Sequence, residues 1–408
     1  MAYCENCGCE LTGQEQFCEK CGTRVLSQNN ICSQIQNVIE SMDLNDALIY
    51  RMSNGSHELF HSNVIAWMLE HDHDFAGVFF PGLKGQPYQV FREKKHMDIV
   101  LETNNGAYVI ENKFKSLPGA YQLERYQRAF EKEKKSKSFV AGVLLGVWNM
   151  FGKGYPPQWS YVDYQDVVKY IEGASDNRTW GDNDSFERLT IIEYGQLVKE
   201  LEACLRKEID WNGGKMPSPS DFASLEGIQL RDLCKKIQTA VFAKRLSQQI
   251  DEDQLNQYAS QNRMGFNFRI TTSFLRGDAI LEVRFFKDSR EESEQKKDDN
   301  WGADCTIGIE VHADKYMWFV KCDEDKVSDE EIVKMLWDKK WFTKDSNRRT
   351  VSGRRQKDGL YSFGEEFKYQ YLPLINETDF TFDSLFNKIQ ANLSQAKNLL
   401  PSLIPKLK

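Results

Sequence analysis

The alternation of hydrophobic and polar positions in the first third of the chain predicts a β-hairpin that carries charge. Two short apolar runs, Ile99–Leu101 and Tyr108–Ile110, are separated by polar residues and a glycine of the kinds that form tight turns. Glu111 and Lys113 continue the second run, although buried strands rarely carry charged residues. Side chains two positions apart on a strand point to the same face. We therefore expect Glu111 and Lys113 to lie together, with Asp98 brought close to them by the hairpin.

Apolar periodicity predicts helices on both sides of this hairpin and two further strands. The expected helices are Ile31 to about Met52, Ser56–Glu70, about Ala120–Lys134, a segment that ends near Tyr170, and Phe186–Lys207, and the expected strands are Phe139–Val147 and Trp159–Tyr164. The helix with Ser56 as its N-cap is expected to bury Leu59, Phe60, Val64, Trp67 and Met68. This order of elements predicts an α/β domain in which a mixed sheet is flanked by helices on both faces.

A linker rich in proline and serine, Met216–Ser220, separates this region from a second pattern of helices and strands. The expected helices are about Ser224–Ser247, Asp329–Lys339 and Phe382–Leu399, and the expected strands are Phe266–Thr272, Ala279–Phe286, Cys305–Val311 and Tyr316–Lys321, with a charged loop at 287–300. We therefore expect three domains, residues 1–27, 28–215 and 216–408, the last of them an α+β domain with no assigned function.

Cysteines are concentrated at the start of the chain. Five of the ten lie within the first 21 residues. Four of these five have the spacing Cys-x2-Cys-x10-Cys-x2-Cys, at Cys4, Cys7, Cys18 and Cys21, and Cys9 is the surplus thiol. Two such paired-thiolate turns supply a tetrahedral four-sulfur site, which suits structural Zn²⁺. The segment resembles the short zinc ribbons of many bacterial proteins.

Composition and charge limit the function only weakly. The 408-residue chain has a formal net charge of −8, whereas nucleic-acid-binding proteins usually have a basic surplus. Basic residues are clustered, however, and two of the clusters flank the charged hairpin. The clusters are Arg92/Lys94/Lys95, Lys113/Lys115, Lys132/Lys134/Lys135/Lys137 and Arg348/Arg349/Arg354/Arg355/Lys357. Neither an apolar leader nor a run of 18 apolar residues is present, so we expect a cytoplasmic protein without a membrane-spanning segment.

The acids and the lysine of the hairpin carry the most specific chemistry in the chain. Two carboxylates beside a lysine can hold a divalent metal ion and orient a water molecule, as phosphodiester hydrolysis requires. The spacing Asp98-x12-Glu111-Asn112-Lys113 resembles the signature of the PD-(D/E)XK nuclease superfamily, with Met97 where a proline usually stands. The resemblance implies a restriction-endonuclease-like fold for this domain.

Two neighbouring segments resemble the same superfamily. Gln122-x3-Tyr126 places two polar residues one helical turn apart and resembles a helix of the exonuclease-type and restriction-type branches. The segment from Glu58 to Trp67 resembles the first helix of a prokaryotic branch. Together these motifs cover residues 50–170, so the resemblance says little about the C-terminal half.

The resemblance implies a role for each residue. Asp98, Glu111 and the backbone carbonyl of Asn112 would bind Mg²⁺ or Mn²⁺. Lys113 would hold or help deprotonate the attacking water, and Glu58 would bind a metal-bound water or a second ion.

Further residues have expected roles in binding the substrate or completing the site. By the same resemblance, Gln122 and Tyr126 would position the scissile phosphate or a neighbouring base. Glu93, just before the hairpin, is an additional candidate acid at the same site.

The expected activity is metal-dependent hydrolysis of DNA, and the resemblance implies a setting in restriction or phage defence. RNA as the substrate, a homo-oligomer and a regulatory protein partner stay open. A first alternative is a catalytically silent nuclease fold that binds nucleic acid or a protein. A second is a zinc metalloprotease, because His57-Glu58-Leu59-Phe60-His61 fits the His-Glu-x-x-His pattern, although Val64 and Trp67 stand where its extended form needs Gly and His.

Overall fold

The structure is a computed structural model. It describes residues 2–3, 10–11, 58–117, 122–131, 137–149, 155–174, 180, 185–261, 266–275, 277–286, 305–322, 330–344, 347–349, 360–363 and 367–403. The described residues fall into two compact units: the first contains those of 1–116, 125–207 and 224–229, and the second contains those of 117–124, 208–223 and 230–408. The division into domains at residues 27 and 215 stays a prediction.

The first unit is built on a five-stranded mixed sheet. Its strands, in spatial order, are β3 (Gln89–Arg92), β4 (Ile99–Glu102), β5 (Ala107–Lys113), β6 (Phe139–Gly146) and β7 (Trp159–Asp163). The pairs β3–β4 and β4–β5 are antiparallel, whereas β5–β6 and β6–β7 are parallel. The predicted mixed sheet and the predicted hairpin are therefore confirmed, and β3 is a strand that the sequence pattern did not predict.

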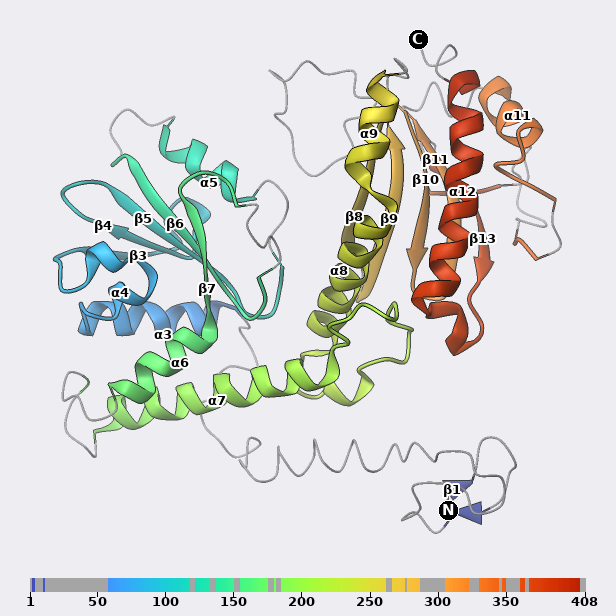
Figure 1. Cartoon of the computed structure of the whole chain (residues 1–408). Helices are drawn as coiled ribbons and strands as arrows, with labels where there is room; N and C mark the ends of the chain where they lie inside the picture. The colour runs from blue at the N-terminus through green and yellow to red at the C-terminus, as the bar shows by residue number, and fades with distance from the viewer. Residues whose placement is uncertain are drawn as a thin grey trace. The chain divides into compact units, whose positions relative to one another are not determined.

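Helices cover both faces of this sheet (Figure 1). They are α3 (Glu58–His71), α4 (Ala76–Phe79), α5 (Gln122–Glu131), α6 (Tyr164–Gly173) and α7 (Phe186–Glu208). The α5 helix lies on one side of the sheet, and α3 and α6 lie on the other. The central strands are apolar on both faces, since Ile99, Val109 and Ile110 are fully buried. The sheet therefore holds the end of β5 rigidly between the two helical layers.

The buried side of α3 differs from the predicted one. Phe60 and Met68 are buried, but Val64 and Trp67 are only half-buried and Leu59 is 42% exposed. His61 and Ser62 instead are fully buried polar side chains. Periodicity misplaced the helix face because these two residues have polar partners inside the unit, which hydropathy alone does not reveal.

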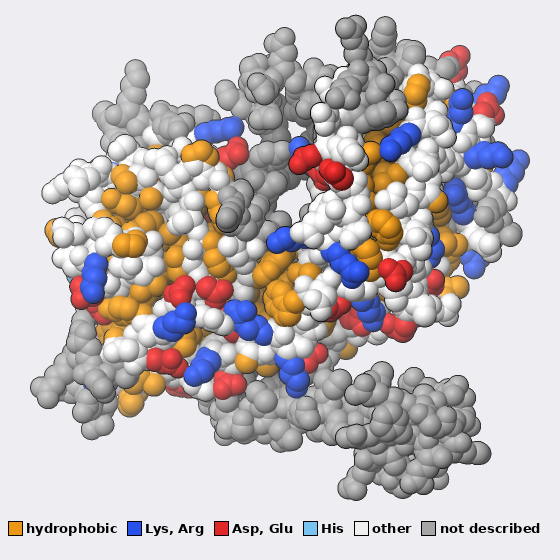
Figure 2. Space-filling model, in the orientation of Figure 1, with side chains coloured by type: hydrophobic (Ala, Val, Ile, Leu, Met, Phe, Trp, Pro, Cys, Tyr) orange, Lys and Arg blue, Asp and Glu red, His pale blue; other side chains and the backbone are white. Residues whose placement is uncertain are grey.

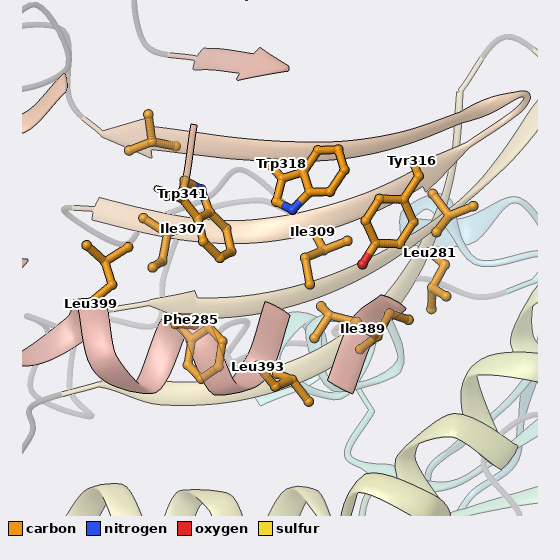
Figure 3. Close-up of a cluster of buried hydrophobic side chains, with 14 of the residues drawn as sticks. Leu281, Phe285, Ile307, Ile309, Tyr316, Trp318, Trp341, Ile389, Leu393 and Leu399 are labelled. Carbon is orange, nitrogen blue, oxygen red and sulfur yellow. The ribbon is translucent and has the colours of Figure 1, made fainter. Parts of the chain in front are cut away.

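The second unit contains a six-stranded antiparallel sheet in the order β12-β13-β11-β10-β9-β8. The strands are β8 (Asn267–Leu275), β9 (Asp278–Phe286), β10 (Cys305–His312), β11 (Lys315–Cys322), β12 (Tyr361–Phe363) and β13 (Phe367–Pro373), and the helices are α8 (Arg231–Ile250), α9 (Glu252–Gln261), α11 (Glu330–Asp338) and α12 (Phe382–Leu403). Figure 3 shows Ile389, Leu393 and Leu399 of α12 packed among side chains of this sheet. The predicted α+β character is thus present in this unit.

Several elements of the second unit differ from the sequence-based expectation. The helix predicted from Ser224 begins at Arg231, because Gln229 has a left-handed backbone (φ 56°) that interrupts a helix. Helix α9 and strands β12 and β13 were not predicted. The predicted loop at 287–300 and most of the basic cluster 348–357 lie outside the described residues. Arg348 and Arg349 are described and, with Trp318, line a cavity of about 430 Å³.

Near the N-terminus the structure describes two short strands, β1 (Ala2–Tyr3) and β2 (Glu10–Leu11), which pair antiparallel. The four cysteines expected to bind zinc and the helix expected at 31–52 lie outside the described residues. Across the described parts of the chain, none of the helices has both the length and the apolar character needed to cross a membrane.

We expect Gly142→Ala to destabilise the first unit. Gly142 on β6 pairs with Trp159 on β7, and a Cβ atom at Gly142 would lie 2.5 Å from the indole ring. Forcing a methyl group into this contact should cost about 1–3 kcal/mol and lower the melting temperature in calorimetry. Gly82→Ala is the matched control, because no heavy atom lies within 4 Å of its added Cβ. Equal melting temperatures for the two variants would contradict the prediction.

Candidate active site

The turn of the β4–β5 hairpin requires a glycine. The Thr103 amide donates to the Gly106 carbonyl oxygen at 2.9 Å. Gly106 has a φ of 149°, and a Cβ atom there would lie 2.4 Å from Val140 Cγ2. With the turn set in this way, Ile99 pairs with Ile110. One position further along, Asp98 and Glu111 become neighbours at the end of the hairpin.

Asp98 is held from two directions. Its Oδ2 atom accepts a hydrogen bond from the Asn112 amide at 2.8 Å. The guanidinium of Arg92 donates to the Asp98 backbone carbonyl, and Arg92 Nε donates to Asn63 Oδ1 at 3.0 Å. Burial raises the pKa of Asp98, although Lys113 and the bond from Asn112 act in the opposite direction. The carboxyl group is therefore fixed in place. Its hydrogen bond from Asn112 and the charge of Lys113 offset only part of the free-energy cost of burying it.

Lys113 lies between two acids. Its Nζ atom is 2.8 Å from Glu111 Oε1 and 3.6 Å from Glu58 Oε2. The Glu111 side chain is only 2% exposed, and the Tyr126 hydroxyl donates to Glu111 Oε1 at 3.3 Å. The structure thus brings together Asp98, Glu111, Lys113 and Glu58, the four residues expected to be catalytic.

Burial and the neighbouring charges shift both partners of the ion pair. Burial, together with the charge of Asp98, raises the pKa of Glu111 to about 7, although Lys113 and Tyr126 favour its ionised form. Burial alone would lower the pKa of Lys113, but the three carboxylates outweigh it and raise that pKa. Lys113 is therefore an ammonium group at neutral pH.

Glu58 reaches the site from the first turn of α3. Its Oε1 atom accepts a hydrogen bond from the Ser116 hydroxyl, and its other oxygen faces Lys113. Ser116 lies three residues beyond the end of β5, so the segment that follows the lysine also holds the acid contributed by α3. No pattern in the sequence indicated Ser116.

The side chain of Asn112 points away from Glu111 and Lys113, as alternation along a strand requires. Its Nδ2 atom donates to the Glu58 carbonyl oxygen at 3.0 Å and to Ser62 Oγ at 2.9 Å. Its Oδ1 atom accepts from the Tyr164 hydroxyl at 2.7 Å. The amide is therefore occupied by structural contacts, which leaves the backbone carbonyl as the group expected to bind a cation.

The residues present suit a hard divalent cation. Among the described side chains, no group of three or more His, Cys, Asp or Glu residues is arranged to hold a metal ion. Mg²⁺, however, is usually bound by one or two carboxylates together with waters, and a backbone carbonyl is a further suitable oxygen. Two neighbouring acids whose pKa values are raised by burial are also a place where added positive charge is favourable.

The remaining predicted residues lie at different distances from this centre. Tyr126 is buried, and its hydroxyl donates a hydrogen bond to the Glu111 carboxylate. Gln122 lies one turn earlier on α5 and is half-buried. The substrate-binding role of both residues stays a prediction. Glu93 has a left-handed backbone (φ 54°), and its amide donates to the Asp98 carbonyl oxygen.

The metalloprotease alternative does not fit the described part of its motif. His61 is fully buried, its Nδ1 atom is 3.1 Å from the Tyr194 hydroxyl, and its ring stacks on Phe114. A catalytic zinc site needs an open coordination position, which a ring enclosed in this way does not provide. His57 lies outside the described residues.

Both basic and acidic side chains lie near the site. Burial lowers the pKa of Lys115, which follows Lys113 by two positions. Lys94 pairs with Glu102, and Lys95 lies over the Phe130 ring. On the face that Figure 2 shows, Lys and Arg side chains of the described residues are interspersed with Asp and Glu. Recognition of a polyanion at this site would therefore depend on individual basic residues and a bound cation.

Comparison with protein families gives one match. Residues 84–209 match the family model of the PD-(D/E)XK nuclease superfamily. The matched segment contains Asp98, Glu111 and Lys113, whereas Glu58 precedes it. No curated protein and no solved structure matches the chain. The match confirms the resemblance at the level of the superfamily and supports a nuclease-type function for this domain. PD-(D/E)XK nucleases generally use Mg²⁺ or Mn²⁺.

We expect the affinity for Mn²⁺ to rise with pH between 6 and 8. A cation binds the carboxylate and not the carboxylic acid, and a Glu111 pKa of about 7 leaves most of the group protonated at pH 6. Because the ionised fraction of Glu111 rises about tenfold between pH 6 and pH 8, the affinity for Mn²⁺ should rise about tenfold over the same range. Calorimetric titration of the full chain without nucleic acid measures it. Glu111→Gln should show weaker binding with a smaller pH dependence, and constant wild-type affinity would contradict the assignment.

Proposed function

We propose that this protein is a metal-dependent nuclease that hydrolyses phosphodiester bonds of DNA. The observation that carries the proposal is the contact of Lys113 with Glu111 and Glu58 beside Asp98, inside a domain whose segment 84–209 matches a nuclease superfamily. Hydrolysis adds the hydroxide part of one water to phosphorus and its proton to the departing oxygen. The site must therefore orient a water, tolerate negative charge and hold the phosphate.

Each residue has a role that follows from its contacts. Asp98, Glu111 and the Asn112 carbonyl would hold Mg²⁺ or Mn²⁺. When bound, the cation makes a coordinated water more acidic and offsets charge on the phosphate. Lys113, as an ammonium, donates hydrogen bonds to the attacking water or to a phosphate oxygen. Of the two roles expected for Lys113, its raised pKa favours holding the water over removing its proton.

Glu58 would bind a water of the same site, since it shares Lys113 with Glu111. Gln122 and Tyr126 would position the scissile phosphate or a base from α5. We place the activity in restriction or phage defence, and in the cytoplasm, on the resemblance and the sequence alone.

Lys113→Ala should reduce DNA cleavage by at least about a hundredfold, because a donor aimed at developing negative charge is worth that much in other active sites. The assay uses supercoiled, linear and single-stranded DNA, with an RNA arm, in Mg²⁺ and in Mn²⁺. Lys84→Ala is the matched control, since Lys84 is an exposed lysine of the same unit.

Three results would decide between the candidate functions. Cleavage lost in Lys113→Ala and kept in Lys84→Ala supports the proposal, and the substrate arm that is cut identifies the nucleic acid. Equal cleavage by both variants contradicts the site assignment. Nucleic-acid binding by the wild type without cleavage in either metal would favour the silent binding module instead.

We also propose that Cys4, Cys7, Cys18 and Cys21 bind one structural Zn²⁺. The spacing of the two thiolate pairs supports this proposal. The short strands β1 and β2 pair on either side of the first thiolate pair, which is compatible with a ribbon.

Elemental analysis of the purified chain should find about one zinc per chain, because four thiolates complete a tetrahedral shell. Cys18→Ser should lose the metal. Cys9→Ser is the control, and it should retain zinc since Cys9 is the surplus thiol. Zinc retained in the first variant, or lost in the second, would refute this ligand set.

A further inference from the structure

A group of hydrogen bonds around Asn112 lies behind the active-site face of β5. On α6, Tyr164 donates to Asn112 Oδ1 at 2.7 Å. Asn112 Nδ2 donates to Ser62 Oγ of α3, 2.9 Å away, and to the Glu58 carbonyl oxygen. These bonds therefore tie β5 and α6 to the helix that carries Glu58.

Proton counting gives the Tyr164 bond one direction. A tyrosine hydroxyl has a single proton, and Tyr164 donates it to Asn112 Oδ1. Burial raises the pKa of Tyr164 well above its ordinary value, so the hydroxyl keeps this proton at neutral pH.

These bonds converge on Asn112, which lies between Glu111 and Lys113. The Tyr164 bond fixes the orientation of the Asn112 amide, since an amide turned over would present Nδ2 to the tyrosine and lose both bonds to α3. Fixing this side chain fixes the backbone of the residue whose carbonyl is expected to bind the cation. It also ties the first turn of α3, and with it Glu58, to β5.

We propose that Tyr164 is a positioning residue for the active site: through Asn112 it sets the Asn112 carbonyl and Glu58 relative to Asp98 and Glu111. This inference rests on the proposed function, because it concerns the same cation site. Tyr164 is fully buried and contacts Asn112, through which it would act. Groups that orient metal ligands in this way typically contribute ten- to a hundredfold to metal affinity.

The same helix offers a matched control. Tyr170, six positions further along α6, donates to Asp72 Oδ2 at 2.7 Å, the same length and donor type as the Tyr164 bond. Asp72 directly follows the C-terminus of α3, whereas Glu58 is the first residue of that helix. Fourteen residues of α-helix separate these ends by about 20 Å. Tyr170→Phe therefore removes an equivalent bond from α6 to the α3 region, at the end remote from the site.

The experiment compares Tyr164→Phe with Tyr170→Phe in the full chain. Both changes delete one hydroxyl and keep the ring. Mn²⁺ binding is followed without nucleic acid by the loss of the free-ion resonance signal, and melting temperatures are recorded in parallel. We expect Tyr164→Phe to weaken Mn²⁺ binding about tenfold and Tyr170→Phe to leave it unchanged, while both variants lose thermal stability. In cleavage assays, Tyr164→Phe should lower kcat and leave KM for DNA unchanged.

Each outcome has a defined meaning. If the wild type binds Mn²⁺ and Tyr164→Phe binds it equally well, or if Tyr170→Phe weakens binding as much, the inference is overturned and the proposed function is unaffected. If the wild type does not bind Mn²⁺, both are overturned. Should Tyr164→Phe not fold, Ser62→Ala replaces it, because this variant removes another partner of the Asn112 amide. It should weaken Mn²⁺ binding in the same direction, and unchanged binding would again overturn the inference.

Discussion

Charge is buried at the end of β5, and the rest of the first unit is arranged to accommodate it. Taking an acid and a lysine out of water is unfavourable unless each gains an opposite charge or hydrogen bonds. Lys113 has Glu111 and Glu58 beside it, and Asp98 has the backbone amide of Asn112. The raised pKa of Glu111 shows that this compensation is incomplete. A cation bound beside these acids would supply positive charge that the neighbouring groups do not.

The two faces of β5 carry different kinds of side chain. One face carries Glu111 and Lys113 toward α5, where Tyr126 supports the acid. The other carries Asn112 toward α3 and α6, where neutral hydrogen bonds replace charge. Alternation along a single strand is enough to produce this division. The charged side chains of the site and the side chain that anchors their strand therefore belong to neighbouring residues of β5.

Sequence reasoning found the reactive face because its signal is local. Asp98, Glu111 and Lys113 lie within 16 residues, and their charges stand out against apolar strands. The supporting face could not be found in this way, because Tyr164 is 52 residues from Asn112 and resembles an ordinary aromatic core residue. His61 and Ser62 were recognisable as polar residues on α3, but hydropathy placed Leu59 inside in their stead. In the second unit, β12 and β13 are half-exposed strands with weak periodicity, and they were missed.

The hydrogen bonds around Asn112 affect how the sequence of this unit can diverge. Their side chains come from α3, β5 and α6, which are joined by long stretches of chain that take no part in them. Replacing one partner by an apolar residue leaves a buried polar atom of another unsatisfied. The connecting stretches can therefore vary independently, whereas Ser62, Asn112 and Tyr164 can change only in concert.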